Sequence, residues 1–395
     1  MTLRTVDGLG EVAGTRVFVR ADLNVPLNDG TVGDDSRIRA TVPTLTELLG
    51  AGATLVVASH LGRPKGRAVD ALRLEPVGRR LGELLGRDIV ALPDVTPDAL
   101  PAADVVLLEN LRFDPGEEAN DPAFAGRLAE LADAYVDDAF GAVHRAHASV
   151  SALPELMLAS GRPAVAGRLL QREVEVLGRL LRDEERPYLA ILGGAKVSDK
   201  LAVIDALVER VDALLIGGAM AFTLLAADGA EVGRSLVETD RLDDVRAAHA
   251  KARERGALIE LPSDVVAAAQ ISVDVDRRTV PAREIPRELM GLDIGPRTVE
   301  EFARLIADAR TILWNGPMGV FELEPFSAGT RGVAMAVGAA DAYSVVGGGD
   351  TLAAIKKAGL EDSFDHLSTG GGASLEFLEG RALPGITILE DGESA

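Results

Sequence analysis

Short apolar runs, each ending in a polar or glycine-rich tip, recur along the chain and alternate with helix-like segments. Nearly continuous apolar strands of this kind are typical of parallel sheets that helices cover on both faces. We expect ten strands, over residues 16–20, 54–60, 104–110, 134–140, 188–194, 213–218, 257–262, 311–316, 343–348 and 365–369. Ten strands are more than a single twisted sheet usually contains, so the pattern predicts two sheets.

The division between the two sheets is expected near the middle of the chain. Apolar residues recur at helical spacing from Leu170 to Leu181, with charged residues between them, which predicts a helix over residues 168–182. We interpret it as a connecting helix, although a simple surface helix would give the same pattern. The predicted fold class is therefore α/β, with two doubly wound parallel-sheet (Rossmann-like) domains, residues 1–165 and 166–375, joined by a hinge helix.

Composition narrows the classes of function. The chain has 62 Asp and Glu against 41 Lys and Arg, a net charge of -21, which disfavours binding to nucleic acid or to an anionic membrane. The absence of cysteine excludes disulfides, thiolate zinc sites, iron–sulfur clusters and a cysteine nucleophile. The N-terminus lacks the apolar core of a signal peptide, and no apolar stretch is long enough to span a membrane. We expect a soluble, cytoplasmic protein.

Charged and amide side chains, most of them basic, gather at the tips of the first four predicted strands. They are Asp22, Asn24, His60, Arg63, Arg112 and Arg145, with Arg37 just downstream of the first tip. Ligands of doubly wound sheets bind beyond the carboxyl ends of the strands, and guanidinium groups match phosphate and carboxylate oxygens in pairs. One such arginine could be a solvated surface residue or half of a structural ion pair. Their recurrence on successive tips instead predicts a site for a small anion.

A pair of histidines in the same region, His144 and His147, could suggest a metal site. The sequence offers no cysteine and no His-Glu-x-x-His pattern to complete a ligand set there. We therefore expect no metal at this pair.

Glycine-rich tips mark the second half of the chain. Gly193-Gly194-Ala195-Lys196 follows a predicted strand, and we expect it to open a helix with Lys196 and Lys200 on one face. Further tips contain Gly217-Gly218, Gly316, Gly347-Gly348-Gly349-Asp350-Thr351 and Gly370-Gly371-Gly372. Glycine lets backbone approach a phosphate, and a helix that begins there offers free N–H groups. A single glycine pair would indicate only a tight turn, but five such tips predict a nucleotide site, with Asp350 as a ligand for Mg2+.

Two common nucleotide motifs are missing. No Gly-x-x-x-x-Gly-Lys-Ser/Thr occurs, which argues against a P-loop NTPase. The one dinucleotide-like match, at Gly8, Gly10 and Ala13, precedes the first strand instead of following it. An NAD-dependent dehydrogenase is therefore disfavoured.

Taken in order, the motifs resemble phosphoglycerate kinase. They are Arg20-Ala-Asp-Leu-Asn-Val-Pro26, His60-Leu-Gly-Arg-Pro-Lys-Gly66, Glu109-Asn-Leu-Arg112, His144-Arg-Ala-His147, Gly193-Gly-Ala-Lys-Val197, Trp314-Asn-Gly-Pro-Met-Gly-Val-Phe-Glu322 and Gly347-Gly-Gly-Asp-Thr351. Each could arise by chance, but the ordered set covers nearly the whole chain. The family transfers a phosphoryl group reversibly between 1,3-bisphosphoglycerate and ADP, giving 3-phosphoglycerate and ATP.

The resemblance implies a role for each motif residue. Phosphoglycerate would contact Asp22, Asn24, Arg37, His60, Arg63, Arg112 and Arg145 in the N-terminal domain. Arg37, Lys196 and the amides of Gly371 and Gly372 would stabilise the transferring group. The nucleotide would be held by Lys200, Gly316, Glu322, Gly348, Gly349, Asp350 and Thr351, with Mg2+ at Asp350.

The resemblance also refines the domain organisation. In this family a hinge closes a cleft between the domains, and the C-terminal segment, about residues 376–395 here, returns to pack on the first domain. Two local departures occur, Gly141-Ala-Val-His144 and Leu261-Pro-Ser-Asp264, and neither removes a charged site residue. A non-catalytic nucleotide- or anion-binding protein on the same scaffold is the alternative, and it would be expected to have lost motif residues.

Overall fold

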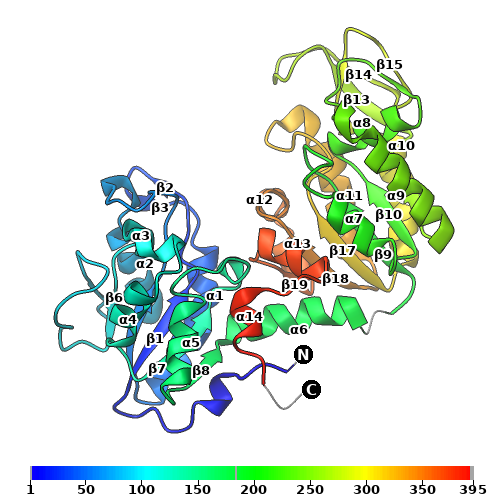
Figure 1. Cartoon of the computed structure of the whole chain (residues 1–395). Helices are drawn as coiled ribbons and strands as arrows, with labels where there is room; N and C mark the ends of the chain where they lie inside the picture. Colours follow the sequence, from blue (N-terminus) through cyan, green and yellow to red (C-terminus); the bar gives the residue numbers. More distant parts are fainter. Residues whose placement is uncertain (1, 183–184, 392–395) are drawn as a thin grey trace. The chain divides into compact units, whose positions relative to one another are not determined.

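The structure is a computed structural model that describes residues 2–182 and 185–391 (Figure 1). The chain forms two compact units, which are treated separately below. Unit 1 comprises the residues up to 175 and those from 382 onward, and unit 2 comprises residues 176–381. The division lies inside helix α6, Arg168–Arg182, whose bounds match the predicted connecting helix. It falls ten residues after the position expected from the sequence, and the C-terminal return begins at residue 382 instead of 376.

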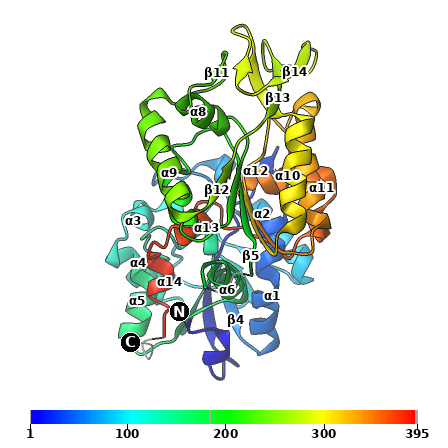
Figure 2. The same cartoon turned by 90° about the vertical axis from the view of Figure 1, so that its right-hand side faces the viewer.

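Unit 1 is built on a six-stranded parallel sheet in the order β5-β6-β4-β1-β7-β8. Its strands are β1 Arg16–Ala21, β4 Thr54–Ala58, β5 Val90–Ala91, β6 Val105–Leu107, β7 Ala134–Asp138 and β8 Ala164–Ala166. Its helices are α1 Ser36–Gly50, α2 Glu75–Leu85, α3 Pro115–Glu118, α4 Pro122–Ala129, α5 Ala152–Ala159 and α14 Pro384–Thr387, and a small hairpin joins β2 Leu27–Asn28 to β3 Thr31–Val32. Helices α1 and α2 lie on one side of the sheet and α4 and α5 on the other (Figure 2).

Unit 2 has a second six-stranded parallel sheet in the order β12-β10-β9-β17-β18-β19. Its strands are β9 Tyr188–Leu192, β10 Ala213–Ile216, β12 Leu258–Glu260, β17 Thr311–Asn315, β18 Tyr343–Gly347 and β19 His366–Leu367. Its helices are α7 Leu201–Leu207, α8 Met220–Ala227, α9 Leu242–Arg255, α10 Pro296–Asp308, α11 Ala328–Ala339, α12 Gly349–Ala358 and α13 Gly372–Leu378. Helices α8 and α9 cover one face of the sheet, and α10 and α11 cover the other (Figure 2).

Two small sheets complete unit 2. An antiparallel sheet joins β14 Arg277–Pro281, β13 Asp264–Ala268 and β16 Met290–Ile294, and a parallel pair joins β11 Glu231–Val232 to β15 Glu284–Ile285. Neither was expected from the sequence. Strand β14 of the antiparallel sheet could not be predicted from an apolar pattern, because four of its five residues are exposed and show no apolar periodicity.

Each sheet lies at the centre of the core of its own unit. The strand residues of β1, β4 and β7 are almost all buried, as are those of β9, β10 and β17. The α/β class with two parallel sheets is therefore confirmed, and all ten expected strands are present. The edge strands β5 and β8 were not predicted, because two or three residues are too few to show a pattern. No helix in the described part of the chain is long and apolar enough to cross a membrane.

Candidate active site

The strand order of unit 1 brings the tips of four strands together. Strands β6, β4, β1 and β7 are adjacent and parallel, with Arg20 level with Ala58 on one side and Asp137 on the other. Because parallel neighbours end at the same edge, the segments that follow them meet there. The residues predicted from these tips are therefore brought to one edge of the sheet.

Arg37 is oriented by a buried carboxylate at this edge. The Asp22 side chain, only 2% exposed, accepts a hydrogen bond from Arg37 Nη1 at 2.8 Å. Arg37 lies in the first turn of α1, and 32% of its side chain remains exposed. Asp22 thus fixes the position of a guanidinium group that solvent can still reach.

Asn24 and Arg112 hold the loop that follows β4. Asn24 Oδ1 accepts a hydrogen bond from the Gly62 amide at 3.0 Å, and Arg112 Nη1 donates to the Gly62 carbonyl at 2.8 Å. Asn110 Oδ1 accepts from the Leu61 amide at 3.2 Å. The same loop carries Arg63, which is exposed. Two of the predicted substrate contacts therefore also shape the backbone beside them.

Positive charge concentrates around His60, which is buried at the tip of β4. Burial lowers the pKa of His60 well below its ordinary value, and Arg20, Arg112 and Arg37 lower it further. His147 lies in the same cluster, and burial together with Arg112, Arg20 and Arg145 lowers its pKa to about 4. The side chain of Arg145 is exposed. Such a cluster is a local basic exception in a chain of charge -21 and attracts a small anion.

The glycine-rich tips of unit 2 allow backbone segments to approach closely. A Cβ atom on Gly193 would lie 2.1 Å from the Pro317 carbonyl, and one on Gly316 would lie 2.2 Å from the Gly193 carbonyl. Direct hydrogen bonds join these tips, including Gly194 N to Pro317 O at 3.1 Å. Glycine is thus required at the ends of β9 and β17 because neighbouring backbone occupies the space of a side chain.

The expectation that Lys196 and Lys200 share one helical face is wrong. Helix α7 begins only at Leu201, and the two lysines lie in the turn that precedes it. The turn is held by Glu238, whose carboxylate accepts from the Ser198 amide at 3.0 Å and from its hydroxyl at 2.6 Å. These bonds to a distant segment compete with the helical pattern, and no local sequence signal reveals them.

The two lysines have different surroundings. Lys196 is exposed, whereas Lys200 is only 8% exposed and its ammonium group donates to Asn315 Oδ1 at the end of β17. Burial lowers the pKa of Lys200 to about 8, against the opposing effect of Asp199 and Asp350.

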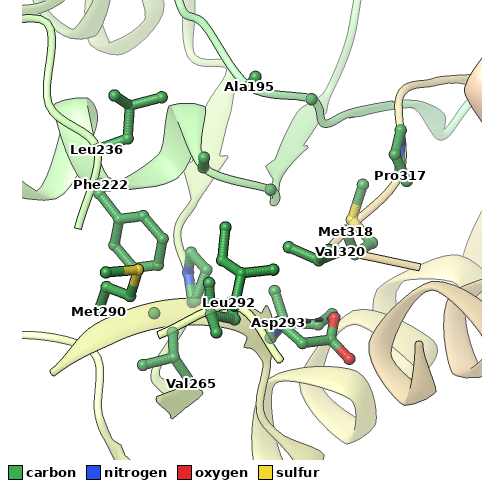
Figure 3. Close-up of a pocket in the computed structure, with 18 of the residues that line it drawn as sticks. Ala195, Phe222, Leu236, Val265, Met290, Leu292, Asp293, Pro317, Met318 and Val320 are labelled. Carbon is green, nitrogen blue, oxygen red and sulfur yellow. Dashed lines mark hydrogen bonds between the residues drawn. The ribbon is translucent and has the colours of Figure 1, made fainter. Parts of the chain in front are cut away.

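A cavity of about 330 Å³ lies in unit 2 beside these tips (Figure 3). Its walls include Phe222 and Leu236, Met290 and Leu292 of β16, and Val320 of the segment after β17. Apolar walls of this kind suit a flat aromatic ring. The sequence did not predict these residues as part of a site, because they are apolar residues that lie far apart in the sequence and have no distinctive chemistry. Only the nearby Gly217-Gly218 tip indicated this region.

Predicted nucleotide residues lie in and next to the same cavity. Glu322 and Asp350 belong to its lining. Helix α12 follows Gly348, whose φ is +91°, so Gly349, Asp350 and Thr351 form its first turn. Thr351 Oγ1 accepts from the Gly316 amide at 2.7 Å, which ties α12 to the tip of β17. A carboxylate therefore lies beside free N–H groups at a helix start.

The last predicted glycines lie at the start of α13. Gly371, with φ of +54°, precedes the helix and Gly372 is its first residue. Apart from adjoining backbone, no atom of the described residues lies within 4 Å of where a Cβ would stand on either residue. In contrast to Gly193, these glycines have open space at the position where a Cβ atom would stand.

Comparison with known proteins gives this pair of sites its context. The family model described as phosphoglycerate kinase matches residues 6–381. The chain belongs to the phosphoglycerate kinase family. It is 55% identical to the phosphoglycerate kinase of Salinispora tropica, across 99% of this chain and the whole of that one. The phosphoglycerate kinase of Pelotomaculum thermopropionicum is 50% identical, across 99% of both chains.

Solved structures agree with this assignment. The phosphoglycerate kinase from Coxiella burnetii superposes with a TM-score of 0.88 at 41% identity, and the one from Pyrococcus horikoshii with 0.86 at 33% identity. Both comparisons cover 98% of each chain. The chain is a glycolytic kinase that transfers a phosphoryl group reversibly between 1,3-bisphosphoglycerate and ADP, as the sequence motifs predicted.

Proposed function

We propose that the basic cluster of unit 1 is the phosphoglycerate site of this kinase. Its members are Asp22, Asn24, Arg37, His60, Arg63, Arg112 and Arg145. The observation that carries the assignment is the Asp22–Arg37 ion pair beside the buried His60. A substrate with a phosphate and a carboxylate would neutralise the mutual repulsion of these cations.

Unit 2 supplies the nucleotide site. The apolar cavity holds the base, and Glu322 in its lining accepts hydrogen bonds from the ribose hydroxyls. Lys200, Gly316, Gly348, Gly349 and Thr351 contact the phosphates. Support comes from Glu322 and Asp350 in the cavity lining. Further support comes from the start of α12 at Gly349, where N–H groups and the helix dipole favour negative charge.

Asp350 is the proposed contact for Mg2+. The family uses a Mg-nucleotide, and the residues fit this ion, since Asp350 is an exposed carboxylate in the cavity lining. Among the described residues no group of three or more His, Asp or Glu could hold a metal ion. This agrees with the preference of Mg2+ for one or two carboxylates, with phosphate oxygens and water as its other ligands. When bound, the ion would neutralise phosphate charge.

The transfer needs cations more than it needs a base. In the direction that consumes ATP, a carboxylate oxygen of 3-phosphoglycerate attacks the terminal phosphorus, and the bond from that phosphorus to the bridging oxygen of ADP breaks. The attacking carboxylate is already ionised near neutral pH, so no proton has to be removed. The protein then contributes orientation and charge stabilisation. Arg37 is assigned to the transferring group from unit 1, and Lys196 with the amides of Gly371 and Gly372 from unit 2.

This assignment places the two substrates in different units of the chain. Unit 1 takes phosphoglycerate, unit 2 takes the nucleotide, and α6 is the hinge that connects them. The kinase is expected to work as a monomer, which multi-angle light scattering would test.

Separate ligand titrations test the division directly. Arg63→Ala should weaken 3-phosphoglycerate binding at least about tenfold and leave Mg-ADP binding unchanged, because a charge-assisted hydrogen bond is lost on one side only. Isothermal titration calorimetry measures both affinities. Loss of Mg-ADP affinity in Arg63→Ala, or an unchanged affinity for 3-phosphoglycerate, would contradict the assignment.

A further inference from the structure

Arg20 is a fully buried arginine beneath the proposed phosphoglycerate site. It points into the unit from β1 and is 0% exposed, so it cannot touch a substrate bound at the surface of the cluster. Three hydrogen bonds hold its guanidinium group. Nε donates to Ser149 Oγ at 2.9 Å, Nη1 to the Ala21 carbonyl at 2.6 Å, and Nη2 meets His60 Nδ1 at 3.0 Å.

The partners of Arg20 are themselves fixed. The buried Glu117 of α3 accepts from the Ser149 hydroxyl at 2.6 Å and from its amide at 2.9 Å. Tyr135, also buried, donates its hydroxyl to the Ser149 carbonyl at 2.8 Å. The guanidinium group therefore cannot turn away from His60 without breaking a buried network.

The contact between Arg20 and His60 has only one arrangement of protons. A guanidinium group stays protonated in proteins and offers donors only. His60 Nδ1 must therefore be the acceptor and carry no proton, and in a neutral imidazole the proton then resides on Nε2. Protonation of Nδ1 would set two donors against each other in a buried site.

We propose that Arg20 is a positioning residue that locks His60 as the neutral tautomer with its proton on Nε2, so that His60 donates a hydrogen bond to the anionic substrate. The donation to substrate rests on the proposed function, whereas the tautomer rests on the Arg20 contact alone. The groups that face His60 favour the same neutral form. They are Arg20 of β1, Arg37 of α1, Arg112 of the short helix Leu111–Phe113 and His147 of the loop before α5.

Long-range 1H–15N correlation spectra of the wild-type protein read the tautomer directly. Their His60 signals can be assigned by comparison with His60→Gln. We expect a pyridine-like Nδ1 and a pyrrole-like Nε2 that stay unchanged from pH 8 to pH 5.5. A proton on Nδ1, or titration of His60 near its ordinary pKa, would overturn the proposal.

Variants separate positioning from a purely structural role. Arg20→Met combined with Glu117→Gln removes the buried cation and its buried anion together, which limits the destabilisation from an unpaired charge. We expect this variant to lose the fixed Nε2–H tautomer of His60 and the KM for 3-phosphoglycerate to rise about tenfold. A retained Nε2–H tautomer with a wild-type KM would show that Arg20 is only structural.

Two single variants serve as controls. Arg20→Lys keeps a donor near Nδ1 and should restore the wild-type tautomer. Ser149→Ala disturbs the same network but leaves the Nη2 contact, so it should lower stability without changing the tautomer. Loss of the tautomer in Ser149→Ala would contradict the role of Nη2.

The same spectra distinguish failure of this inference from failure of the proposed function. Added 3-phosphoglycerate should shift the Nε2 resonance of the wild-type protein. A correct tautomer with no such shift would refute the substrate contact while leaving the Arg20 assignment intact.

Discussion

Arg37 shows how a single residue is prepared for charge stabilisation. Its guanidinium group is anchored by the buried Asp22 and stays partly exposed. Arg39, two residues later on the same helix, pairs instead with Asp35 at 2.9 Å and is mostly exposed. Arg37 is held at the edge of the sheet where the strand tips meet, whereas Arg39 is held by the residue that precedes its own helix. Only Arg37 is therefore assigned to the transferring group.

Replacing Arg37 should affect turnover more than binding. Arg37→Ala is expected to lower kcat by about 10²–10³-fold, because a preorganised donor to developing charge is lost. Arg39→Ala is the matched control and should keep the wild-type rate. Steady-state kinetics at saturating 3-phosphoglycerate and Mg-ATP measure both. A kcat near wild type in Arg37→Ala would remove Arg37 from the reaction.

Lys200 should make nucleotide binding depend on pH. Burial lowers its pKa to about 8 in the free protein, and bound phosphates stabilise the charged form and raise that pKa. Nucleotide affinity should thus be full below pH 8 and weaken as the pH rises through 8, and binding at pH 8 should take up about half a proton.

Calorimetry in buffers of different ionisation enthalpy measures this proton uptake. Lys200→Arg keeps the charge at every working pH, so its affinity should lose the pH dependence. Equal proton uptake in the wild type and in this variant would assign the effect to another group.

At the scale of elements, the tips of β9 and β17 depend on glycine. Gly193→Ala should destabilise unit 2 by about 1–3 kcal/mol, because its Cβ would meet the Pro317 carbonyl at 2.1 Å. Gly126→Ala is the control, since Gly126 lies inside α4 and, apart from the backbone of its own helix, no atom of the described residues lies within 4 Å of its added Cβ. This substitution should stabilise the protein by about 0.5–1 kcal/mol. Denaturant unfolding midpoints check both values. A Gly193→Ala protein as stable as the wild type would contradict the close approach.

The elements also show what sequence can predict. The ten strands were found because buried parallel strands are continuous apolar runs, and their tips carry the polar residues of the site. The helical placement of Lys196 and Lys200 failed because Glu238, forty residues away, holds the turn before α7. Phe222 and Leu292 were missed because their position in the cavity comes from tertiary packing alone. Arg20 could be read as part of a motif, but its burial could not.

At the scale of the whole molecule, buried carboxylates should link stability to pH. Burial raises the pKa of Asp137 and of Asp293 to about 7 and that of Asp138 to about 6. A carboxyl group whose pKa is raised in the folded state contributes stability that is full below its unfolded pKa and is lost as pH rises through the folded value. Each of the two groups near 7 should therefore cost about 1 kcal/mol between pH 6.5 and pH 8.

Thermal or denaturant unfolding across this range tests the link. Asp137→Asn reports on unit 1 and Asp293→Asn on unit 2, and each should reduce the loss of stability as pH rises. The range from pH 6.5 to pH 8 lies above the lowered pKa values of His60 and His147, so the change in stability over this range does not come from these histidines. Stability that is independent of pH between 6.5 and 8 would contradict the raised values.

The central claim is that one chain holds two substrates in two separate units. The most direct measurement is a crossed set of calorimetric titrations of 3-phosphoglycerate and Mg-ADP into the wild type, Arg63→Ala and Lys200→Ala. We predict that Arg63→Ala loses affinity for 3-phosphoglycerate alone and Lys200→Ala loses affinity for Mg-ADP alone, each by at least about tenfold. A loss of affinity for the other ligand in either variant would contradict this claim. Unchanged affinity for both ligands would contradict it as well.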